Sequence, residues 1–346
     1  MPTVPNMKAL AVARDDAPAI EMIEVEAPNP RPDEAVIAVN AFSVNRGETF
    51  LLERERAGWR PGKDISGWVV AACADGSGPA VGARVVAHLE GGDWAELVAA
   101  GSDRLVELPE RVSHTDAATL PLAGLTALRL LRVVGPLYGR TVLLTGASGG
   151  VGHFFVELAA AQGARVTAVT ASRARGQRLL ELGAHAIVTD VQLARGPFEV
   201  ILDSVGGDTT QAAWRTLTSE GTFVWFGQAS RTPSTLDFFD WTGGLNATLR
   251  KFHYLEPVDE IQEDLSTLVD LIAAGRLTPE IGFLGDWTLT ENAIEHLLAR
   301  RLRGHAVLAL PNGTDRNHTD PNRKTSQEVK SQAASVRGGG NARCSW

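Results

Sequence analysis

The sequence predicts an α/β protein that combines a doubly wound parallel sheet with a separate β-rich part. Residues 1–110 consist of short β-type runs separated by Gly, Pro and Asp, a spacing typical of a barrel or sandwich. From Thr141 onward, strand-like runs alternate with helical patterns of about 10–15 residues, which indicates βαβ units in a parallel sheet. A glycine-rich segment joins the first of these strands to its helix, as in many nucleotide-binding sheets.

The β-rich part is expected to end in a helical region. Ser113–Leu131 carries a helical pattern, and Pro121 and Gly124 are expected to divide it into two pieces. The strands before it are expected at Ala35–Asn40, Gly67–Ala72, Ala83–His88 and Trp94–Ala99.

Glycine marks the ends of several helices in the second half. Gly163, Gly183 and Gly275 each follow a helical pattern, and glycine most easily adopts the left-handed conformation that stops a helix. The elements after residue 259 are expected to return to the β-rich part. The expected strands are Thr141–Thr145, Arg165–Thr170, Ala186–Val188, Glu199–Asp203, Thr222–Phe226 and Ala306–Leu310, and the expected helices are Val151–Gln162, Arg173–Leu182, Asp208–Leu217, Glu260–Ala274 and Thr290–Arg301.

Composition limits the class of protein. The 346 residues suit about two domains, and Cys73 and Cys344 are too few for a zinc cluster or a disulfide framework. A net charge of −8 disfavours nucleic-acid and anionic-membrane partners. Met1–Leu10 shows no signal-peptide pattern, and no apolar run reaches the ~18–20 residues of a membrane span. We therefore expect a cytoplasmic protein, with a disordered tail after Pro311 because that region has few large apolar residues.

The segment Thr141–Gly152 predicts a dinucleotide site. Gly146, Gly149, Gly150 and Gly152 allow a sharp turn in which a pyrophosphate can approach main-chain N–H groups at a helix N-terminus. A glycine cluster alone would also fit a tight structural turn. The strand before it and the helix after it are the context that favours the dinucleotide.

The end of the second strand favours NADP(H) over NAD(H). An NAD site would carry a carboxylate about 20 residues past the glycines, where it would bind the ribose diol. Here Ser172, Arg173 and Arg175 follow the strand, and a hydroxyl with two guanidinium groups suits a 2′-phosphate. The alternative is that the two arginines form only a solvated helix start.

Further motifs occur in order between Met7 and Leu310. They are Val44-Asn45-Arg46-Gly47-Glu48; Pro61-Gly62-Lys63-Asp64 with Gly67 and Val69; Val81-Gly82-Ala83-Arg84-Val85; Leu120-Pro121 with Gly124-Leu125-Thr126-Ala127; Gly146–Gly152; Asp203-Ser204-Val205-Gly206-Gly207; Phe226-Gly227-Gln228-Ala229-Ser230; and Arg303-Gly304-His305-Ala306-Val307.

This ordered set resembles the medium-chain dehydrogenase/reductases, in their zinc-independent quinone oxidoreductase (zeta-crystallin-like) branch. The resemblance implies a GroES-like β-rich domain, a central Rossmann domain and an active-site cleft between them. The implied boundaries are 1–122 and 259–312 for the GroES-like domain, 123–258 for the Rossmann domain and 313–346 for the tail. It also implies an NADPH-dependent reductase that forms a homodimer through its Rossmann sheets.

The resemblance also assigns the site. Asn45 and Thr126 are implied near the nicotinamide, and Arg46 is the cation best placed for an oxyanion. The alternatives are that Asn45 is a turn residue and Arg46 a surface or inter-domain ion pair. The implied cofactor-binding residues are Asn45, Thr126, Gly146, Ser148, Gly149, Gly150, Val151, Ser172, Arg173, Arg175, Val205, Phe226, Gly227 and Ser230.

No zinc is expected, because Asn45 and Lys63-Asp64 stand where the zinc enzymes of the superfamily place Cys and His ligands. The expected reaction is hydride transfer to a quinone or an α,β-unsaturated carbonyl. One alternative is a pathway-specific enoyl reductase of secondary metabolism. Another is a non-catalytic NADPH-binding protein, since Phe50 and Asp190 stand where relatives often carry tyrosines.

Two aromatic groups remain. Tyr254 is expected to have a packing role, although it could face the cleft. Phe238–Trp241 is expected to form an interface.

Overall fold

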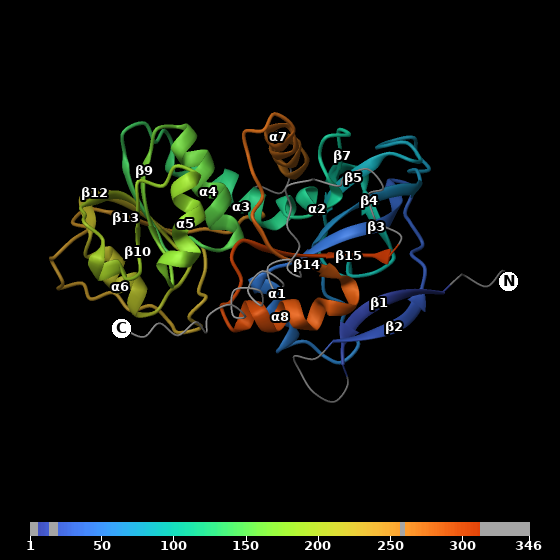
Figure 1. Cartoon of the computed structure of the whole chain (residues 1–346), viewed down its shortest axis with the longest axis horizontal. Helices are drawn as coiled ribbons and strands as arrows, with labels where there is room; N and C mark the ends of the chain where they lie inside the picture. Colours follow the sequence, from blue (N-terminus) through green and yellow to red (C-terminus); the bar gives the residue numbers. More distant parts are fainter. Residues whose placement is uncertain (1–5, 14–19, 257–259, 312–346) are drawn as a thin grey trace, which may run out of the picture. The chain divides into compact units, whose positions relative to one another are not determined.

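The computed structural model describes residues 6–13, 20–256 and 260–311. Its central feature is the parallel sheet that the alternating pattern predicted, which has six strands (Figure 1). Numbered along the chain, the strands lie in the order 3-2-1-4-5-6. All of them are parallel, and the order in which they are added to the sheet reverses between the first and fourth strands. This switch point is where doubly wound sheets bind ligands. In spatial order the strands are β10 (Ala186–Val188), β9 (Arg165–Val169), β8 (Thr141–Leu144), β11 (Phe198–Asp203), β12 (Leu217–Trp225) and β13 (Thr248–Lys251).

The apolar runs of this sheet bury side chains on both faces. In β8, Val142 and Leu144 join one core cluster, whereas Leu143 between them joins another. Such alternation requires helices on both faces. The helices beside the sheet are α3 (Leu125–Val134), α4 (Gly150–Ala161), α5 (Arg173–Glu181) and α6 (Asp208–Trp214), and α7 (Ile261–Ala273) packs against α3 and β7 (Leu105–Glu107).

A second sheet contains strands from both ends of the described chain. β15, near the C-terminal end, pairs antiparallel with β3, so that Ala306 lies opposite Val44. The core on this sheet includes Trp94, Phe42 and Ile65, none of which is exposed. Its strands are β14 (Ile281–Asp286), β15 (His305–Ala309), β3 (Glu34–Val44), β4 (Asp64–Ala71), β5 (Arg84–His88) and β7 (Leu105–Glu107), with β6 (Leu97–Gly101) on β3 and a separate hairpin of β1 (Asn6–Val12) and β2 (Ile20–Glu26).

Three short helices complete the elements on this side: α1 (Arg46–Leu52), α2 (His114–Ala117) and α8 (Thr290–Leu298). The helical region 113–131 divides as expected, because a π-helical turn over Leu120–Gly124 separates α2 from α3. The strand expected at Trp94–Ala99 begins only at Leu97, since Trp94 itself is buried in a loop beneath β3.

The sequence did not predict three elements of the structure. β13 is exposed at all four positions, so it lacks the apolar run that marked its neighbours. β14 contains Gly282 and Gly285, which weaken a strand pattern. α1 has only seven residues, too few to show a helical period.

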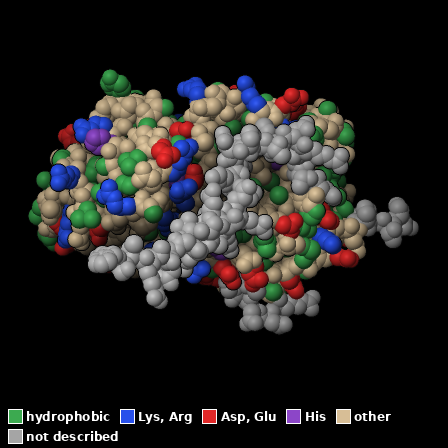
Figure 2. All heavy atoms as spheres, in the orientation of Figure 1, with side chains coloured by type: hydrophobic (Ala, Val, Ile, Leu, Met, Phe, Trp, Pro, Cys, Tyr) green, Lys and Arg blue, Asp and Glu red, His purple; other side chains and the backbone are tan. Residues whose placement is uncertain are grey.

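Several expectations remain predictions. The domain boundaries, the homodimer and the cytoplasmic location are not tested by the fold, and the tail at 313–346 lies outside the described residues. Phe238, Phe239 and Trp241 are 78%, 75% and 62% exposed, as an interface would require. In the view of Figure 2, acidic side chains are interspersed among the basic ones. None of the described helices has the length and apolar character needed to cross a bilayer.

Candidate functional site

A cavity of about 780 Å³ lies at the switch point of the parallel sheet. It is lined by the carboxyl ends of β8 and β11, by the N-terminus of α4, and by α1 and the start of β15 from the other sheet. This volume is typical of a small-molecule or cofactor site. The cavity therefore joins the glycine turn to residues of the β-rich part.

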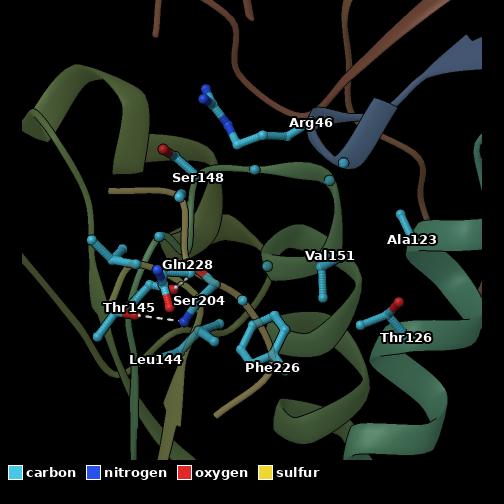
Figure 3. A pocket seen from close by; sticks show the side chains of 18 of the residues that line it. Arg46, Ala123, Thr126, Leu144, Thr145, Ser148, Val151, Ser204, Phe226 and Gln228 are labelled. Carbon is cyan, nitrogen blue, oxygen red and sulfur yellow. Dashed lines mark hydrogen bonds between the residues drawn. The ribbon is translucent and has the colours of Figure 1, made fainter. Parts of the chain in front are cut away.

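The glycine turn is fixed by close packing. Gly146 has φ +64°, and a Cβ there would lie 2.4 Å from Ser204 Oγ. A Cβ on Gly152 would lie 2.1 Å from the Ala147 carbonyl oxygen. The turn thus needs glycine at both positions, and it places the first N–H groups of α4 at the cavity (Figure 3). Unpaired N–H groups at a helix N-terminus favour an anion.

Asp203 organises the opposite wall. Its buried carboxylate accepts hydrogen bonds from the hydroxyls of Thr145 and Thr210, each at 2.6 Å, and from the N–H of Val205 at 3.0 Å. Ser204 then donates back to the Thr145 carbonyl oxygen at 3.0 Å. This network holds Val205 and the following glycines at the edge of the cavity.

Three arginines line the same cavity: Arg46, Arg175 and Arg300. None of them has a carboxylate partner among the described residues. Arg175 donates to the carbonyl oxygens of Arg300 and Leu302, and its buried Nε has no partner. Arg46 donates to the Leu297 carbonyl oxygen. Burial lowers the pKa of Arg46, and the charges of Arg300 and Arg175 lower it further. Accumulated positive charge of this kind fits a phosphate.

The structure places most of the predicted cofactor residues on this cavity, and three elsewhere. Ser172 caps α5, where its hydroxyl accepts from the Arg175 N–H at 3.3 Å. Arg173 is exposed and lies outside the lining, and Ser230 interacts with Thr232 instead. The cavity lining contains Asn45, Thr126, Gly146, Ser148, Gly149, Gly150, Val151, Arg175, Val205, Phe226 and Gly227.

Arg46 and Thr126 lie toward different parts of the cavity. Figure 3 shows Arg46 near Ser148 of the glycine turn, with Thr126 beyond Val151. Besides burial, the charges of three arginines lower the pKa of Arg46: those of Arg300, Arg175 and Arg231. Its placement therefore favours contact with a phosphate over the oxyanion role predicted from the sequence.

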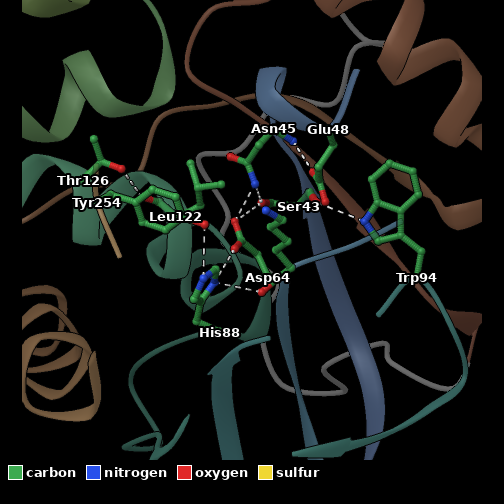
Figure 4. Close-up of polar contacts among 10 residues, drawn as sticks. Ser43, Asn45, Glu48, Asp64, His88, Trp94, Leu122, Thr126 and Tyr254 are labelled. Atoms are coloured by element: carbon green, nitrogen blue, oxygen red, sulfur yellow. Dashed lines mark hydrogen bonds and ion pairs between the residues drawn. The ribbon is translucent and has the colours of Figure 1, made fainter. Parts of the chain in front are cut away.

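The side-chain hydrogens of Asn45 and Thr126, the two polar residues predicted near the nicotinamide, are already used in hydrogen bonds within the protein. Asn45 Nδ2 donates to Asp64 Oδ2 at 2.7 Å and to Ser43 Oγ at 3.2 Å (Figure 4). Thr126 Oγ1 donates to the Leu122 carbonyl oxygen at 2.6 Å. Both side chains can accept a hydrogen bond from a ligand, but their own hydrogens are directed into the protein.

Tyr254 is a cavity residue that the sequence analysis assigned to packing. It lines the cavity, and its hydroxyl lies 3.2 Å from His88 Nε2. His88 is separated from it by 166 positions in the chain. No spacing or motif in the sequence connects these two residues.

Three buried carboxyl groups lie behind Asn45. Glu48, Asp64 and Asp93 are at most 1% exposed. Burial raises the pKa of Glu48 to about 8, and the charge of Asp64 adds to this. Burial, followed by the charges of Glu48 and Asp64, raises the pKa of Asp93. Ionising all three carboxyl groups would place like charges close together in the interior, which is costly.

Glu48→Gln is expected to reduce the loss of stability as the pH rises. The folded-state pKa of Glu48, about 8, exceeds its ordinary value of 4.5, so the stability it contributes is complete below about 4.5 and is lost as the pH rises through 8. Between these values the stability difference between wild type and variant should change by at most about 1.4 kcal/mol per pH unit. Urea unfolding from pH 5 to 9 measures it. The exposed Glu55→Gln is the control, and a Glu48→Gln slope equal to wild type would contradict the expectation.

Comparison with known proteins adds a family to this geometry. Residues 150–274 match the family described as "Zinc-binding dehydrogenase". A chloroplast envelope quinone oxidoreductase homolog of Arabidopsis thaliana is 34% identical over 173 residues, covering 45% of this chain and 53% of the relative. The chain thus aligns with only about half the length of that relative. The quinone oxidoreductase of Pseudomonas aeruginosa is 29% identical over 84% of this chain and 95% of its own length.

Zinc does not fit the donor atoms in the described residues. Within 6–13, 20–256 and 260–311, no three His, Cys, Asp or Glu side chains are grouped so that they could hold a metal ion. Asn45 presents an amide already bonded to Asp64, and Lys63 presents an ammonium. Thiolate and imidazole groups are the usual zinc ligands.

Solved structures support the same relationship. A mycobacterial protein complexed with NADPH is 26% identical and has a TM-score of 0.79, covering 88% of this chain and 99% of that one. The quinone oxidoreductase of Coxiella burnetii, 24% identical with a TM-score of 0.78, shares the fold over 88% of this chain and 99% of its own. These comparisons confirm the resemblance found in the ordered motifs, which is to the medium-chain dehydrogenase/reductases and their zinc-independent quinone oxidoreductase branch.

Proposed function

We propose that the chain is an NADPH-dependent oxidoreductase that transfers hydride to a quinone or an α,β-unsaturated carbonyl compound. One observation carries the proposal: a single cavity is lined by the glycine turn, by three arginines and by apolar side chains. The apolar side chains of the lining include Phe50, Leu122 and Phe252. A planar, uncharged acceptor fits the apolar side chains, and a phosphorylated cofactor fits the arginines and the glycine turn.

The residues present fit NADP(H). The turn Gly146–Gly152 would hold the pyrophosphate, and Arg175, with its unpartnered Nε, would hold the 2′-phosphate together with Arg300. When bound, the nicotinamide supplies the hydride. Phe226 and Val151 line the path from the turn toward Thr126, so they would pack against the cofactor and exclude water from it.

The proposal is tested by following NADPH oxidation by absorbance, with quinones, small enones and enoyl thioesters as acceptors. We expect turnover that prefers NADPH to NADH and is unchanged by a metal chelator. Turnover confined to enoyl thioesters would favour a dedicated enoyl reductase. Tight NADPH binding without turnover of any acceptor would contradict the oxidoreductase and favour a binding protein.

Arg175→Glu is expected to weaken NADPH binding by about 10–100-fold, because a charge-assisted contact contributes about 1.5–3 kcal/mol. NADH, which lacks the 2′-phosphate, should be affected much less. Fluorescence titration of both cofactors measures the difference. Arg173→Glu is the matched control, since Arg173 lies on the same turn of α5 but outside the cavity lining. Equal losses for NADPH and NADH would contradict the assignment of Arg175.

A further inference from the structure

The reduction proposed above needs a proton as well as a hydride, and the residues predicted near the nicotinamide do not supply one. The amide hydrogens of Asn45 are directed to Asp64 and Ser43, and the hydroxyl hydrogen of Thr126 to the Leu122 carbonyl oxygen. A side chain that donates the proton must therefore be another one that reaches the cavity.

Tyr254 has the required position. It lines the cavity, and Figure 4 shows its ring between the labelled Thr126 and His88. Its hydroxyl is 3.2 Å from His88 Nε2, within hydrogen-bond reach. Its carbonyl oxygen accepts a hydrogen bond from Arg129 Nη1 at 2.7 Å, which fixes the backbone that carries the ring.

His88 connects Tyr254 to a buried carboxylate. His88 Nδ1 lies 3.1 Å from the Lys63 carbonyl oxygen and 3.4 Å from Asp64 Oδ1. Both neighbours are acceptors, so Nδ1 carries a proton and Nε2 is the nitrogen that exchanges one with Tyr254. Among the described residues, Asp64 Oδ1 has no hydrogen-bond partner, and His88 Nδ1 at 3.4 Å faces it.

We propose that Tyr254 is the proton donor of this reduction and that His88, held by Asp64, returns the proton to it. This inference rests on the proposed function and names the catalytic acid of that same site. The unpartnered buried oxygen of Asp64 and the Tyr254–His88 contact are the observations that carry it.

The proton and electron count is balanced. The acceptor gains a hydride, so the electron pair of its C=C or C=O bond moves to oxygen as an enolate or phenolate. The O–H bond of Tyr254 then breaks, and its proton forms a C–H bond at the α-carbon of an enone or an O–H bond on a quinol. His88 Nε2–H protonates the tyrosinate, and the imidazole becomes neutral. Water that enters the cavity after product release returns one proton to His88 through Tyr254.

Other charged and titratable groups surround this pair. Burial raises the pKa of Tyr254, and the charges of Asp64 and Glu48 raise it further, so the phenol keeps its proton in the resting protein. Lys63 lies at the cavity, and the ring of His253 is 5.6 Å from that of Tyr254. A phenol that stays protonated can serve as a donor as long as a partner replaces the proton.

The hydrogen bond can be tested without cofactor or turnover. The chain contains two tyrosines, and Tyr138 is 90% exposed. With ¹³Cζ-labelled tyrosine, NMR should therefore show one signal for each, and Tyr254→Phe assigns them. His88→Gln should shift the Tyr254 signal and leave that of Tyr138 in place. A Tyr254 signal unchanged by His88→Gln would overturn the relay.

The catalytic role is tested by reduction of a small enone in D2O. Tyr254→Phe should lower kcat by about 10²–10⁴-fold, the usual contribution of a general acid, while NADPH affinity is retained. The wild type should place deuterium on one face of the α-carbon, and the variant on both faces. Tyr138→Phe is the matched control with unchanged kinetics.

The outcomes separate the inference from the proposed function. Wild-type turnover with an equally fast and equally stereospecific Tyr254→Phe would overturn the inference alone. A wild type that oxidises no NADPH with any acceptor would overturn the proposed function, and the proton-donor role with it. A Tyr254 signal that moves in His88→Gln while kcat stays unchanged in Tyr254→Phe would leave Tyr254 with a structural contact only, which also contradicts the proposal.

Discussion

Asp264→Ala is expected to destabilise the protein by about 3–5 kcal/mol, the usual effect of breaking a buried ion pair. Asp264 on α7 is 0% exposed, and Arg129 on α3 is 3% exposed. Arg129 Nε donates to Asp264 Oδ2 at 2.6 Å, and Arg132 donates to the other oxygen. Removing the carboxylate leaves the Arg129 guanidinium buried without its counter-charge.

Urea unfolding of the cofactor-free protein measures this loss. Asp270→Ala is the matched control, because Asp270 is exposed on the same helix and its removal should change stability by no more than about 0.5 kcal/mol. The double variant Arg129→Met with Asp264→Leu should recover much of the stability, since apolar residues of similar size often replace a buried pair without loss. If Asp264→Ala costs less than about 1 kcal/mol, the pair cannot be buried in the way described.

The pair also affects the candidate site. Arg129 donates to the carbonyl oxygen of Tyr254, so α3, α7 and the segment after β13 are joined at one guanidinium. A partially folded Asp264→Ala protein should therefore lose the Tyr254–His88 contact before it loses the glycine turn. During denaturation, the ¹³Cζ signal of Tyr254 follows the loss of the Tyr254–His88 contact, and NADPH titration follows the loss of the glycine turn.

The part of the site proposed to hold the cofactor was predictable because its signals are local. The glycines at 146–152, the strand before them and the helix after them occupy one short stretch, and their backbone requirements appear directly in residue type. Arg175 was predictable for the same reason, since it follows the second strand. Its neighbour Arg173 carries the same charge but points out of the cavity, and only the helix geometry separates the two.

The substrate half was not predictable to the same extent. Tyr254 and His88 meet across 166 positions, and the fold alone brings them together. Asn45 and Thr126 were placed at the cavity through the family resemblance, but residue type could not show that their hydrogens are committed to Asp64, Ser43 and Leu122. Arg300 was missed because it belongs to a helix end whose contact with Arg175 is also long-range.

Gly152→Ala is expected to cost about 3 kcal/mol of stability and to abolish measurable NADPH binding. Its Cβ would lie 2.1 Å from the Ala147 carbonyl oxygen and 2.6 Å from the Ala147 carbonyl carbon. Both are backbone atoms of a fully buried residue, so a side-chain rotation cannot relieve the overlap. The turn itself has to move, and the N–H groups of α4 move with it.

Gly149→Ala separates binding from stability in the same turn. Gly149 has φ −84° and ψ 176°, which alanine also adopts, and its Cβ would meet only the Gly146 carbonyl oxygen at an ordinary 3.5 Å. Stability should therefore change by less than about 1 kcal/mol. NADPH binding should still weaken, because Gly149 lines the cavity and the added methyl group would stand where the pyrophosphate approaches.

Urea unfolding and NADPH fluorescence titration of both variants measure the two effects separately. A destabilised Gly152→Ala together with a stable but weakly binding Gly149→Ala would show that one turn has two distinct requirements for glycine. At Gly152 the requirement is close backbone packing, and at Gly149 it is room for the ligand. Undiminished NADPH binding in Gly149→Ala would place the pyrophosphate away from this turn, and the assignment of the glycine segment would then be wrong.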